Sequence, residues 1–462
     1  MRAGENLRAR HTMLEKNDLI ELTVEGMTSE GSGVARADGI AVFLPLALPG
    51  DKVEARIVKT AKNCIYGKVE RVITPSPDRV EPDCPVFGKC GGCVYRDAEY
   101  AAELRYKKDK MSAALRRIGG IDVEVPDVLG CEEPERYRNK LMLPVGVDFD
   151  GFPRCGFYAK RSHRIVPSDD CALHPEVFMR IAHFTFDYLM AKGVSAYDET
   201  VGRGMLRHIY IRQAPTSGEI MLCIVVNGDK LECGAGFAAE VMERFPEIKS
   251  VVMNINRADG NIILGAKCVT LAGADYIYGT LRGVNIRISP LSFCQVNSAQ
   301  TERLYDIAEE FAELTPETRL LDLYCGAGLI GLSMASKVKE LIGVEIIPDA
   351  VEDAKANAAA SGVTNAEFFC GDAPVAAEKL RCAGREPDVV IIDPPRAGCA
   401  PALVYTVTDM KPERIVYISC DVATQARDLK LFAERGYKTV KAQGVDMFPR
   451  TAHVEAAALL TR

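Results

Sequence analysis

The stretch RLLDLYCGAGLIGL, residues 319–332, reads as an apolar strand that runs into a glycine-rich turn and then into an apolar helix. Glycine at such a turn lets backbone N–H groups come close to a ligand, because no Cβ atom stands in the way. Gly326, Gly328 and Gly331 satisfy the pattern G-x-G-x-x-G. Dinucleotide dehydrogenases share this pattern, so by itself it predicts a nucleotide-like ligand without identifying it.

The sequence around this stretch alternates short apolar segments with helical patterns. The apolar segments are RLLDLY, LIGVEI, AEFFCG, VVIID and RIVYIS. Alternation of this kind is typical of parallel βα units. We therefore predict that residues 286–462 form an α/β domain with a doubly wound, Rossmann-like sheet.

Acidic side chains lie in or just after four of these predicted strands: Asp322, Glu345, Asp372 and Asp393. The carboxyl ends of parallel strands meet at one crevice, which is where open α/β sheets bind ligands. Each acid alone could be a helix cap or a turn former. A dinucleotide site has no evident use for the Asp-Pro-Pro that begins at Asp393, so the set favours S-adenosylmethionine over NAD.

Cys420 follows the strand RIVYIS directly, a position from which open sheets present catalytic side chains. A thiolate at such a position can act as a covalent nucleophile. A reaction that passes through a covalent adduct also needs a base, and Glu455 is our candidate. The alternative for Cys420 is a buried structural thiol, one of 16 cysteines in the chain.

The amino-terminal region predicts a small β-domain. Residues 18–72 contain five short strand patterns separated by glycine turns, which suggests an OB-like barrel over residues 14–75. A generic β-domain is the alternative. Residues 80–285 are mixed and predict a central α+β domain, with a basic helix over 97–118 that could pack on the catalytic domain and strand-like pieces that include NIILG (261–265).

Cys84, Cys90 and Cys93 form the pattern C-x5-C-x2-C, which lacks a fourth ligand. Four thiolates would suit either an iron–sulfur cluster or structural zinc. The 462-residue chain has no apolar run long enough to cross a membrane and no signal-peptide core, so we expect a cytoplasmic monomer with reduced cysteines. Its net charge is −7, but residues 1–120 carry a small basic excess, where we expect contact with a polyanion.

Several motifs together resemble the bacterial RNA uracil-C5-methyltransferases, in the same order and through nearly the whole chain. They are FCQVN (293–297), DLYCGAG (322–328), GVE (343–345), DPPRAG (393–398), YISCD (417–421) and DMFPRTAHVE (446–455). The resemblance implies that Gln295, Tyr324, Glu345 and Asp393 contact S-adenosylmethionine, that Cys420 is the nucleophile and that Glu455 is the base. Asp372 is assigned to the same cofactor site.

The resemblance also extends to the rest of the chain. It implies that the barrel is a TRAM domain and that Cys171 completes a [4Fe–4S] site with Cys84, Cys90 and Cys93. RYRNK (136–140) and MLRHIYIR (205–212) resemble family motifs whose cations could hold phosphates. A barrel together with a cluster implies 23S ribosomal RNA as the substrate. The alternatives are a transfer-RNA uridine methyltransferase, an NAD-linked iron–sulfur oxidoreductase and a non-catalytic RNA-binding protein.

Overall fold

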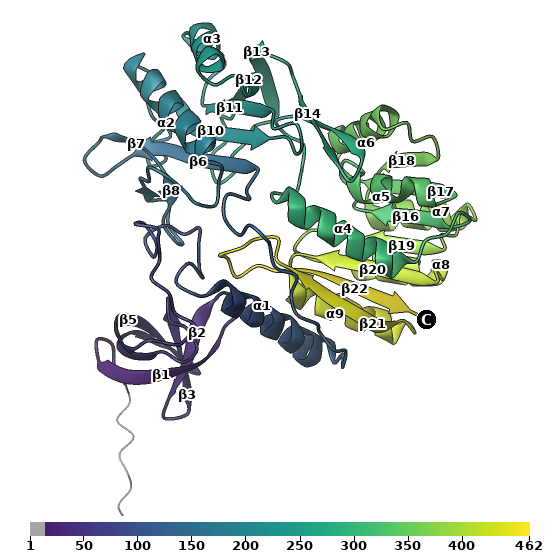
Figure 1. Cartoon of the computed structure of the whole chain (residues 1–462), viewed down its shortest axis with the longest axis horizontal. Coiled ribbons are helices and arrows are strands. Elements are labelled where there is room, and N and C mark those ends of the chain that lie inside the picture. Colours follow the sequence, from purple (N-terminus) through teal and green to yellow (C-terminus); the bar gives the residue numbers. More distant parts are fainter. Residues whose placement is uncertain (1–13) are drawn as a thin grey trace, which may run out of the picture. The chain divides into compact units, whose positions relative to one another are not determined.

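The computed structural model describes residues 14–462, which divide into two compact units (Figure 1). The first unit holds the described chain up to Gly88 together with Cys93–Tyr106 and Arg450–Ala452. The second unit holds Lys89–Gly92, Lys107–Pro449 and His453–Arg462. The three-domain division at residues 14–75, 80–285 and 286–462 stays a prediction. No helix among the described residues is long and apolar enough to cross a membrane.

The first unit contains a closed barrel with the strand order β1-β2-β3-β5-β4, as the amino-terminal pattern predicts. Alternate side chains of the strands point inward and form a small apolar core that includes Val24, Val42 and Ile57. The strands are β1 (Leu19–Met27), β2 (Ser32–Ala37), β3 (Ile40–Pro45), β4 (Lys52–Thr60) and β5 (Cys64–Thr74).

The predicted basic helix is α1 (Tyr100–Ala114), and it continues into one π-helical turn, η1 (Leu115–Gly119). The turn η1 packs against helix α9 (Val422–Glu434). Within α1, the Lys107 ammonium is buried and donates to Asp446 Oδ1 at 2.6 Å and to the Phe448 carbonyl at 3.2 Å. This carboxyl-terminal part of α1 is therefore fixed to the segment that leads into the last strand of the chain.

A six-stranded sheet with the order β13-β12-β11-β10-β6-β7 forms the first part of the second unit. Helices α2 (Glu176–Ala191) and α3 (Gly234–Arg244) share an apolar core with one face of it. The strands are β6 (Lys140–Val147), β7 (Pro153–Cys155), β10 (Leu206–Gln213), β11 (Ile220–Val226), β12 (Ile248–Ile255) and β13 (Lys267–Gly273). The short strands β8 (Phe157–Tyr158) and β9 (Ile165–Val166) form a separate two-stranded sheet that contacts β6 and β7.

The strand-like reading of NIILG is wrong, because residues 261–265 form a loop. Two asparagines, Asn254 in β12 and Asn256 just after it, satisfy the backbone of this loop. Asn256 Nδ2 donates to the carbonyls of Ile262 and Ile263 at 2.6 and 2.9 Å. Asn254 Oδ1 accepts the Gly265 N–H at 2.8 Å. Asparagine side chains thus take the place of a neighbouring strand.

The carboxyl-terminal part of the second unit is a seven-stranded sheet with the order β18-β17-β16-β19-β20-β22-β21. Its strands are β16 (Arg319–Leu323), β17 (Glu340–Glu345), β18 (Ala366–Cys370), β19 (Val389–Ile392), β20 (Arg414–Ser419), β21 (Lys438–Val445) and β22 (Glu455–Thr461). All are parallel except β22, which pairs antiparallel with both neighbours. The predicted doubly wound sheet is confirmed, and its strand order reverses between β16 and β19.

Helices cover both faces of this sheet (Figure 1). Helix α4 (Ser298–Ala312) packs on β20, β21 and β22, while α9 packs on β20 and β21 beside α8 (Pro401–Met410). The hairpin β14 (Ile277–Leu281) and β15 (Val284–Ile288) precedes α4 and packs on α6 (Pro348–Ala360). The remaining helices are α5 (Leu329–Met334), η2 (Ala335–Lys337) and α7 (Ala373–Cys382).

Candidate functional site

The predicted catalytic and cofactor residues are concentrated at one edge of the seven-stranded sheet. Glu345 is the last residue of β17, while Asp393 and Cys420 are the first residues after β19 and β20. Because these strands are parallel, their carboxyl ends meet at the same edge. The Asp393 N–H donates to the Leu323 carbonyl at 3.3 Å, which joins the ends of β19 and β16 at the point where the strand order reverses.

Strand register brings Cys420 and Glu455 to the same place. Strands β20 and β22 pair antiparallel with Ser419 opposite Ala456, so the next opposed positions are Cys420 and Glu455. Gln425 of α9 ties the two strands together, because its Nε2 donates to the carbonyls of Tyr417 and Ala456 at 3.0 and 2.9 Å. The thiol and the carboxyl are therefore held by two adjacent, buried strands.

The electrostatics of this pair depend on burial and on two neighbours. Glu455 is 3% exposed, and burial raises its pKa to about 8, with Asp393 adding to the rise and Arg396 opposing it. Burial also raises the pKa of the Cys420 thiol; Glu455 adds to that rise and Arg396 lowers it. At neutral pH the pair is therefore mainly a thiol beside a protonated carboxyl, with one guanidinium near both.

The glycine turn after β16 is built around Glu345. Its two carboxylate oxygens accept the N–H groups of Gly326 and Ile347 at 3.1 and 2.9 Å. Tyr324 is the first residue of the turn. Its φ of 63° lies in the left-handed region, which residues other than glycine rarely adopt. Gly328 has a φ of 79°, and a Cβ there would lie 3.0 Å from the Phe368 ring. The strained turn is thus fixed by one carboxylate and one close contact.

Asp322, inside β16, is buried beneath this turn. Its Oδ2 accepts the Gly331 N–H at 3.0 Å, whereas its Oδ1 is buried without a hydrogen-bond partner among the described residues. Burial raises the Asp322 pKa to about 7. An orphaned carboxyl oxygen at this edge fits a site that a polar ligand completes.

Gln295 and Asp372 are fixed by fewer hydrogen bonds than Glu345. Gln295 lies in the loop before α4, where its carbonyl accepts Asn139 Nδ2 at 2.9 Å. Asp372 is exposed at the amino-terminal cap of α7, and its side chain makes no capping hydrogen bond. Tyr324 lies near both Asp372 and Glu345, and burial, with these acids adding to it, raises the pKa of its hydroxyl.

The four predicted cluster ligands are half-buried cysteines. Cys84 and Cys93 belong to the first unit, and Cys90 and Cys171 belong to the second. The Gly92 N–H donates to Cys90 Sγ at 3.4 Å. Within residues 14–462, no group of three or more His, Cys, Asp or Glu side chains is arranged to hold a metal ion.

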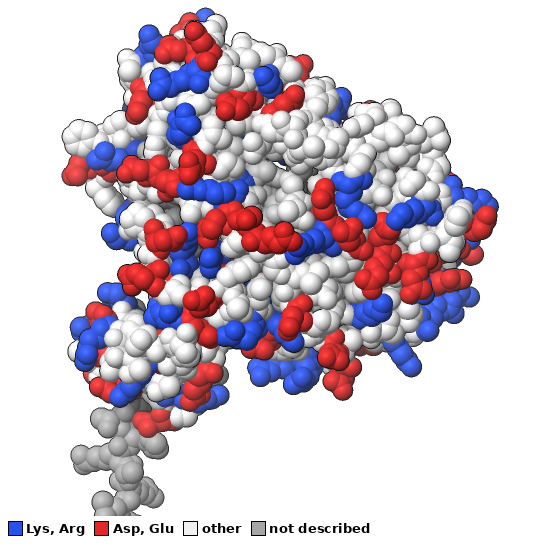
Figure 2. Space-filling model, viewed as in Figure 1, with Lys and Arg blue, Asp and Glu red and all other residues white. Residues whose placement is uncertain are grey.

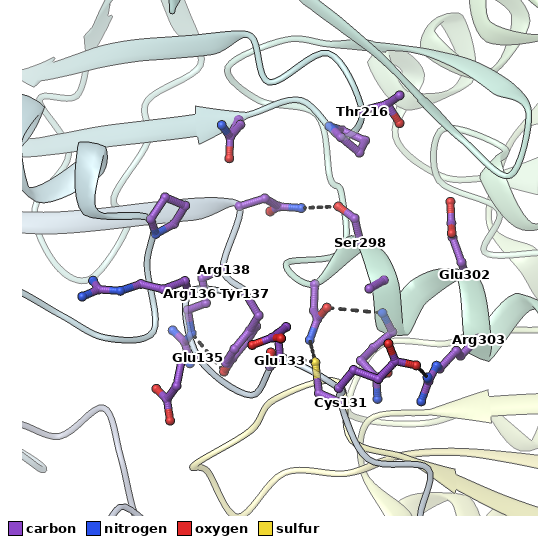
Figure 3. A pocket seen from close by; sticks show the side chains of 18 of the residues that line it. Cys131, Glu133, Glu135, Arg136, Tyr137, Arg138, Thr216, Ser298, Glu302 and Arg303 are labelled. Carbon is purple, nitrogen blue, oxygen red and sulfur yellow. Dashed lines mark hydrogen bonds and ion pairs between the residues drawn. The ribbon is translucent and has the colours of Figure 1, made fainter. Parts of the chain in front are cut away.

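A groove of about 900 Å³ lies elsewhere in the second unit, bounded by residues 131–139, the turn 213–218 and the start of α4 (Figure 3). Its wall includes the hydrogen bond from Asn139 Nδ2 to Ser298 Oγ at 3.1 Å. None of the predicted catalytic or cofactor residues lines it. Five acids and three arginines line the groove, so it offers no basic surface for phosphate. Acidic and basic side chains are also interspersed over the face shown in Figure 2.

Sequence reasoning missed the roles of two residues. Arg396 was indistinguishable from an ordinary surface charge, yet it lies beside Cys420 and Glu455; its place directly after Asp-Pro-Pro was the available signal. No sequence pattern indicated the role of Gln425, because its side chain links β20 to β22 and that pairing is not visible in the sequence. His453, two residues before the predicted base, packs edge-on against Phe448.

Comparison with known proteins gives consistent matches over nearly the whole chain. The model of the tRNA (uracil-5-)-methyltransferase family matches residues 265–462, and that of the TRAM domain matches residues 14–69. Uncharacterized RNA methyltransferases of Halalkalibacterium halodurans and Listeria innocua are each 43% identical, over 97% of this chain and 98% and 99% of theirs. The solved tRNA (uracil-54, C5)-methyltransferase of Pyrococcus abyssi, in complex with S-adenosyl-L-homocysteine, is 27% identical with a TM-score of 0.76, over 96% of this chain and 99% of its own.

Proposed function

Because the chain belongs to the tRNA (uracil-5-)-methyltransferase family and carries a TRAM domain, we propose that it transfers a methyl group from S-adenosylmethionine to C5 of a uridine in RNA. The observation that carries this proposal is the pairing of Cys420 with Glu455 at adjacent strand ends. Family membership also removes the alternative of an NAD-linked oxidoreductase.

The residues at the sheet edge fit S-adenosylmethionine. Gln295, Tyr324, Glu345, Asp372 and Asp393 would hold it, at the point where the strand order reverses. The unpaired Oδ1 of Asp322 supports a polar ligand there. When bound, S-adenosylmethionine supplies an electrophilic methyl group.

Cys420 would act as the nucleophile. Its sulfur forms a bond to C6 of the uracil, and the electron pair of the C5–C6 double bond moves toward the C4 carbonyl, so that C5 becomes nucleophilic. The thiol must first lose its proton, which passes to water. Burial raises the Cys420 pKa, and the positive charge of Arg396 opposes that rise and so favours the thiolate.

Glu455 would act as the base. C5 gains the methyl group as the bond between that group and the sulfonium sulfur breaks, which leaves S-adenosylhomocysteine. The proton on C5 then passes to the Glu455 carboxylate, the C5–C6 double bond re-forms and the bond between the Cys420 sulfur and C6 breaks. A raised pKa makes Glu455 a stronger base than an exposed carboxylate, as this step requires. The close approach of Cys420 and Glu455 lets one bound uracil contact both.

We propose 23S ribosomal RNA as the substrate, because the chain combines a TRAM barrel with four cysteines that can serve as cluster ligands. Transfer RNA is the second candidate. The Pyrococcus abyssi enzyme, named for a tRNA uridine, matches 96% of this chain, so the presence of all these regions does not by itself exclude tRNA.

Mapping of 5-methyluridine in a deletion strain separates the two substrates. We expect the methyl group to disappear from a uridine of 23S rRNA, while 5-methyluridine in tRNA stays unchanged. Mass spectrometry of nuclease fragments from both RNAs measures this, and a plasmid-borne wild-type gene should restore the mark. Loss from tRNA with 23S rRNA unchanged would show that the rRNA assignment is wrong.

We also propose that Cys84, Cys90, Cys93 and Cys171 hold a [4Fe–4S] cluster. Four thiolates are the ligand set of such clusters. The described side chains are not grouped around a metal site, so the proposal rests on the four cysteines and on the family resemblance of their positions. We expect anaerobically purified protein to contain about four irons per chain. Cys171→Ala should lose the iron, whereas Cys64→Ala, at a half-buried cysteine of the barrel, should keep it. Stoichiometric zinc without iron would contradict this assignment.

A further inference from the structure

Of the cations that the segments 136–140 and 205–212 supply, three arginines are held by an ion pair or by backbone carbonyls. Arg136 pairs with Asp170 at 2.6 Å and donates to two carbonyls. Arg207 is 3% exposed and donates to the carbonyls of Asn256 and Ala258. Arg212, also 3% exposed, donates to the carbonyls of Ser289 and Ser292 at 2.6 and 2.7 Å. These three arginines therefore hold the fold together.

Lys140 differs from these arginines. It begins β6, directly opposite Arg212 of β10, so the two cationic side chains emerge on the same face of the sheet. Like charges in directly opposed positions destabilise an antiparallel pair. Lys140 is half-buried, and no Asp or Glu forms an ion pair with it among residues 14–462. Burial lowers the pKa of the Lys140 ammonium to about 8, and the nearby positive charge of Arg212 adds to this effect.

The surroundings of Lys140 place it beside the loop that carries Gln295. Its neighbour Asn139 donates its backbone N–H to the Val296 carbonyl at 2.9 Å and its side-chain Nδ2 to the Gln295 carbonyl. Cys294 of the same loop lies close enough to Lys140 to influence the pKa of its ammonium. Two large apolar side chains are exposed here: Phe293, 65% exposed on the loop, and Met142, 38% exposed on the same face of β6 as Lys140.

A partly buried ammonium opposite a second cation is unfavourable unless an anion binds to it. We propose that Lys140 binds a phosphate of the RNA backbone next to the target uridine. This inference rests on the proposed function. The exposed apolar side chains suit the faces of neighbouring bases, and a lysine binds phosphate as a compact point charge. The other anion in the reaction is the carboxylate of S-adenosylmethionine, and the experiment distinguishes the two.

The test compares Lys140→Met with Lys140→Arg in the full-length protein. We expect Lys140→Met to weaken RNA binding about tenfold at low salt and to reduce the slope of log K against log salt by about 0.7 to 0.9, the value for one phosphate contact. Lys140→Arg should keep most of the slope. Lys230→Met, at an exposed lysine paired with Glu232, is the matched control and should leave the slope unchanged. Affinity for S-adenosylhomocysteine should be the same in all four proteins, which also shows that they are folded.

A second measurement locates the phosphate. RNAs that carry one uncharged methylphosphonate on either side of the target uridine should bind the wild type less tightly at one position. The methylphosphonate at that position should not weaken RNA binding by the Lys140→Met protein any further, because the contact is already lost. An unchanged salt slope in Lys140→Met would overturn the proposal, and so would a selective loss of S-adenosylhomocysteine binding, which would assign Lys140 to the cofactor carboxylate. Failure of the proposed function would look different: RNA binding would respond as expected, but no 5-methyluridine would form.

Discussion

Replacing Cys420 with alanine will abolish methyl transfer and the covalent protein–RNA adduct together. Without a nucleophile at C6, the C5 position of uracil is too weak to attack the methyl group, and loss of a catalytic nucleophile can cost about 10⁶-fold in turnover. We expect a fall of at least about 10⁴-fold, measured as transfer of labelled methyl groups to RNA.

The matched control is Cys382→Ala, at an exposed cysteine that ends α7. It should keep wild-type activity, because Cys382 lies away from the edge where the strands end. Unchanged binding of S-adenosylhomocysteine by Cys420→Ala would show that the cofactor site is intact. Methyl transfer to C5 by Cys420→Ala would mean that the nucleophile is another residue.

Replacing Glu455 with glutamine will separate methyl transfer from product release. Cys420 can still add to C6, but the C5 proton then has no base, so the methylated covalent intermediate should accumulate. Turnover should fall by about 10²- to 10⁴-fold, the usual contribution of a general base. Single-turnover assays that quantify adduct and free product separately measure both steps, and Glu434→Gln, at the exposed end of α9, is the control.

The pH dependence of release tests the same assignment in the wild type. Glu455 must be ionised to accept the proton, and burial keeps its pKa at about 8. The rate of product release should therefore rise about tenfold per pH unit below pH 8 and level off above it. The Glu455→Gln protein should not show this rise. A wild-type release rate that stays flat between about pH 6 and pH 9 would exclude Glu455 as the base.

Much of the fold could be predicted because its elements have simple patterns. The strands of the barrel alternate apolar and polar residues between glycine turns, and β16, β17 and β20 are continuous apolar runs that read as buried parallel strands. Helix α2 was not predicted, because EVFMRIAHFTFDYLMA is rich in aromatic residues and apolar on most sides, a composition that also suits a strand. The edge strand β13 was missed because its side chains are mostly exposed or half-buried.

The site could be predicted only where it depends on the ends of successive strands. Carboxylates that follow parallel strands converge for topological reasons, which is why Glu345 and Asp393 could be assigned from order alone. The opposition of Cys420 and Glu455 depends on β22 inserting antiparallel between β20 and β21, and no local pattern specifies that insertion. Arg396 lies in the loop after β19, which pairs parallel with β20, so its place after Asp-Pro-Pro puts it at the same edge as Cys420. Only its closeness to Glu455 depends on the insertion of β22.

The central claim is that Cys420 bonds to C6 of a uridine and that Glu455 then removes the C5 proton. RNA with 5-fluorouridine at the target position tests this directly, because the methylated intermediate has no C5 proton to lose. In the presence of S-adenosylmethionine, we expect a denaturation-resistant complex whose digest contains the Cys420 peptide joined to a methylated 5-fluorouridine. A complex without the methyl group, a modified peptide that lacks Cys420, or normal release of product from the fluorinated RNA would contradict the account.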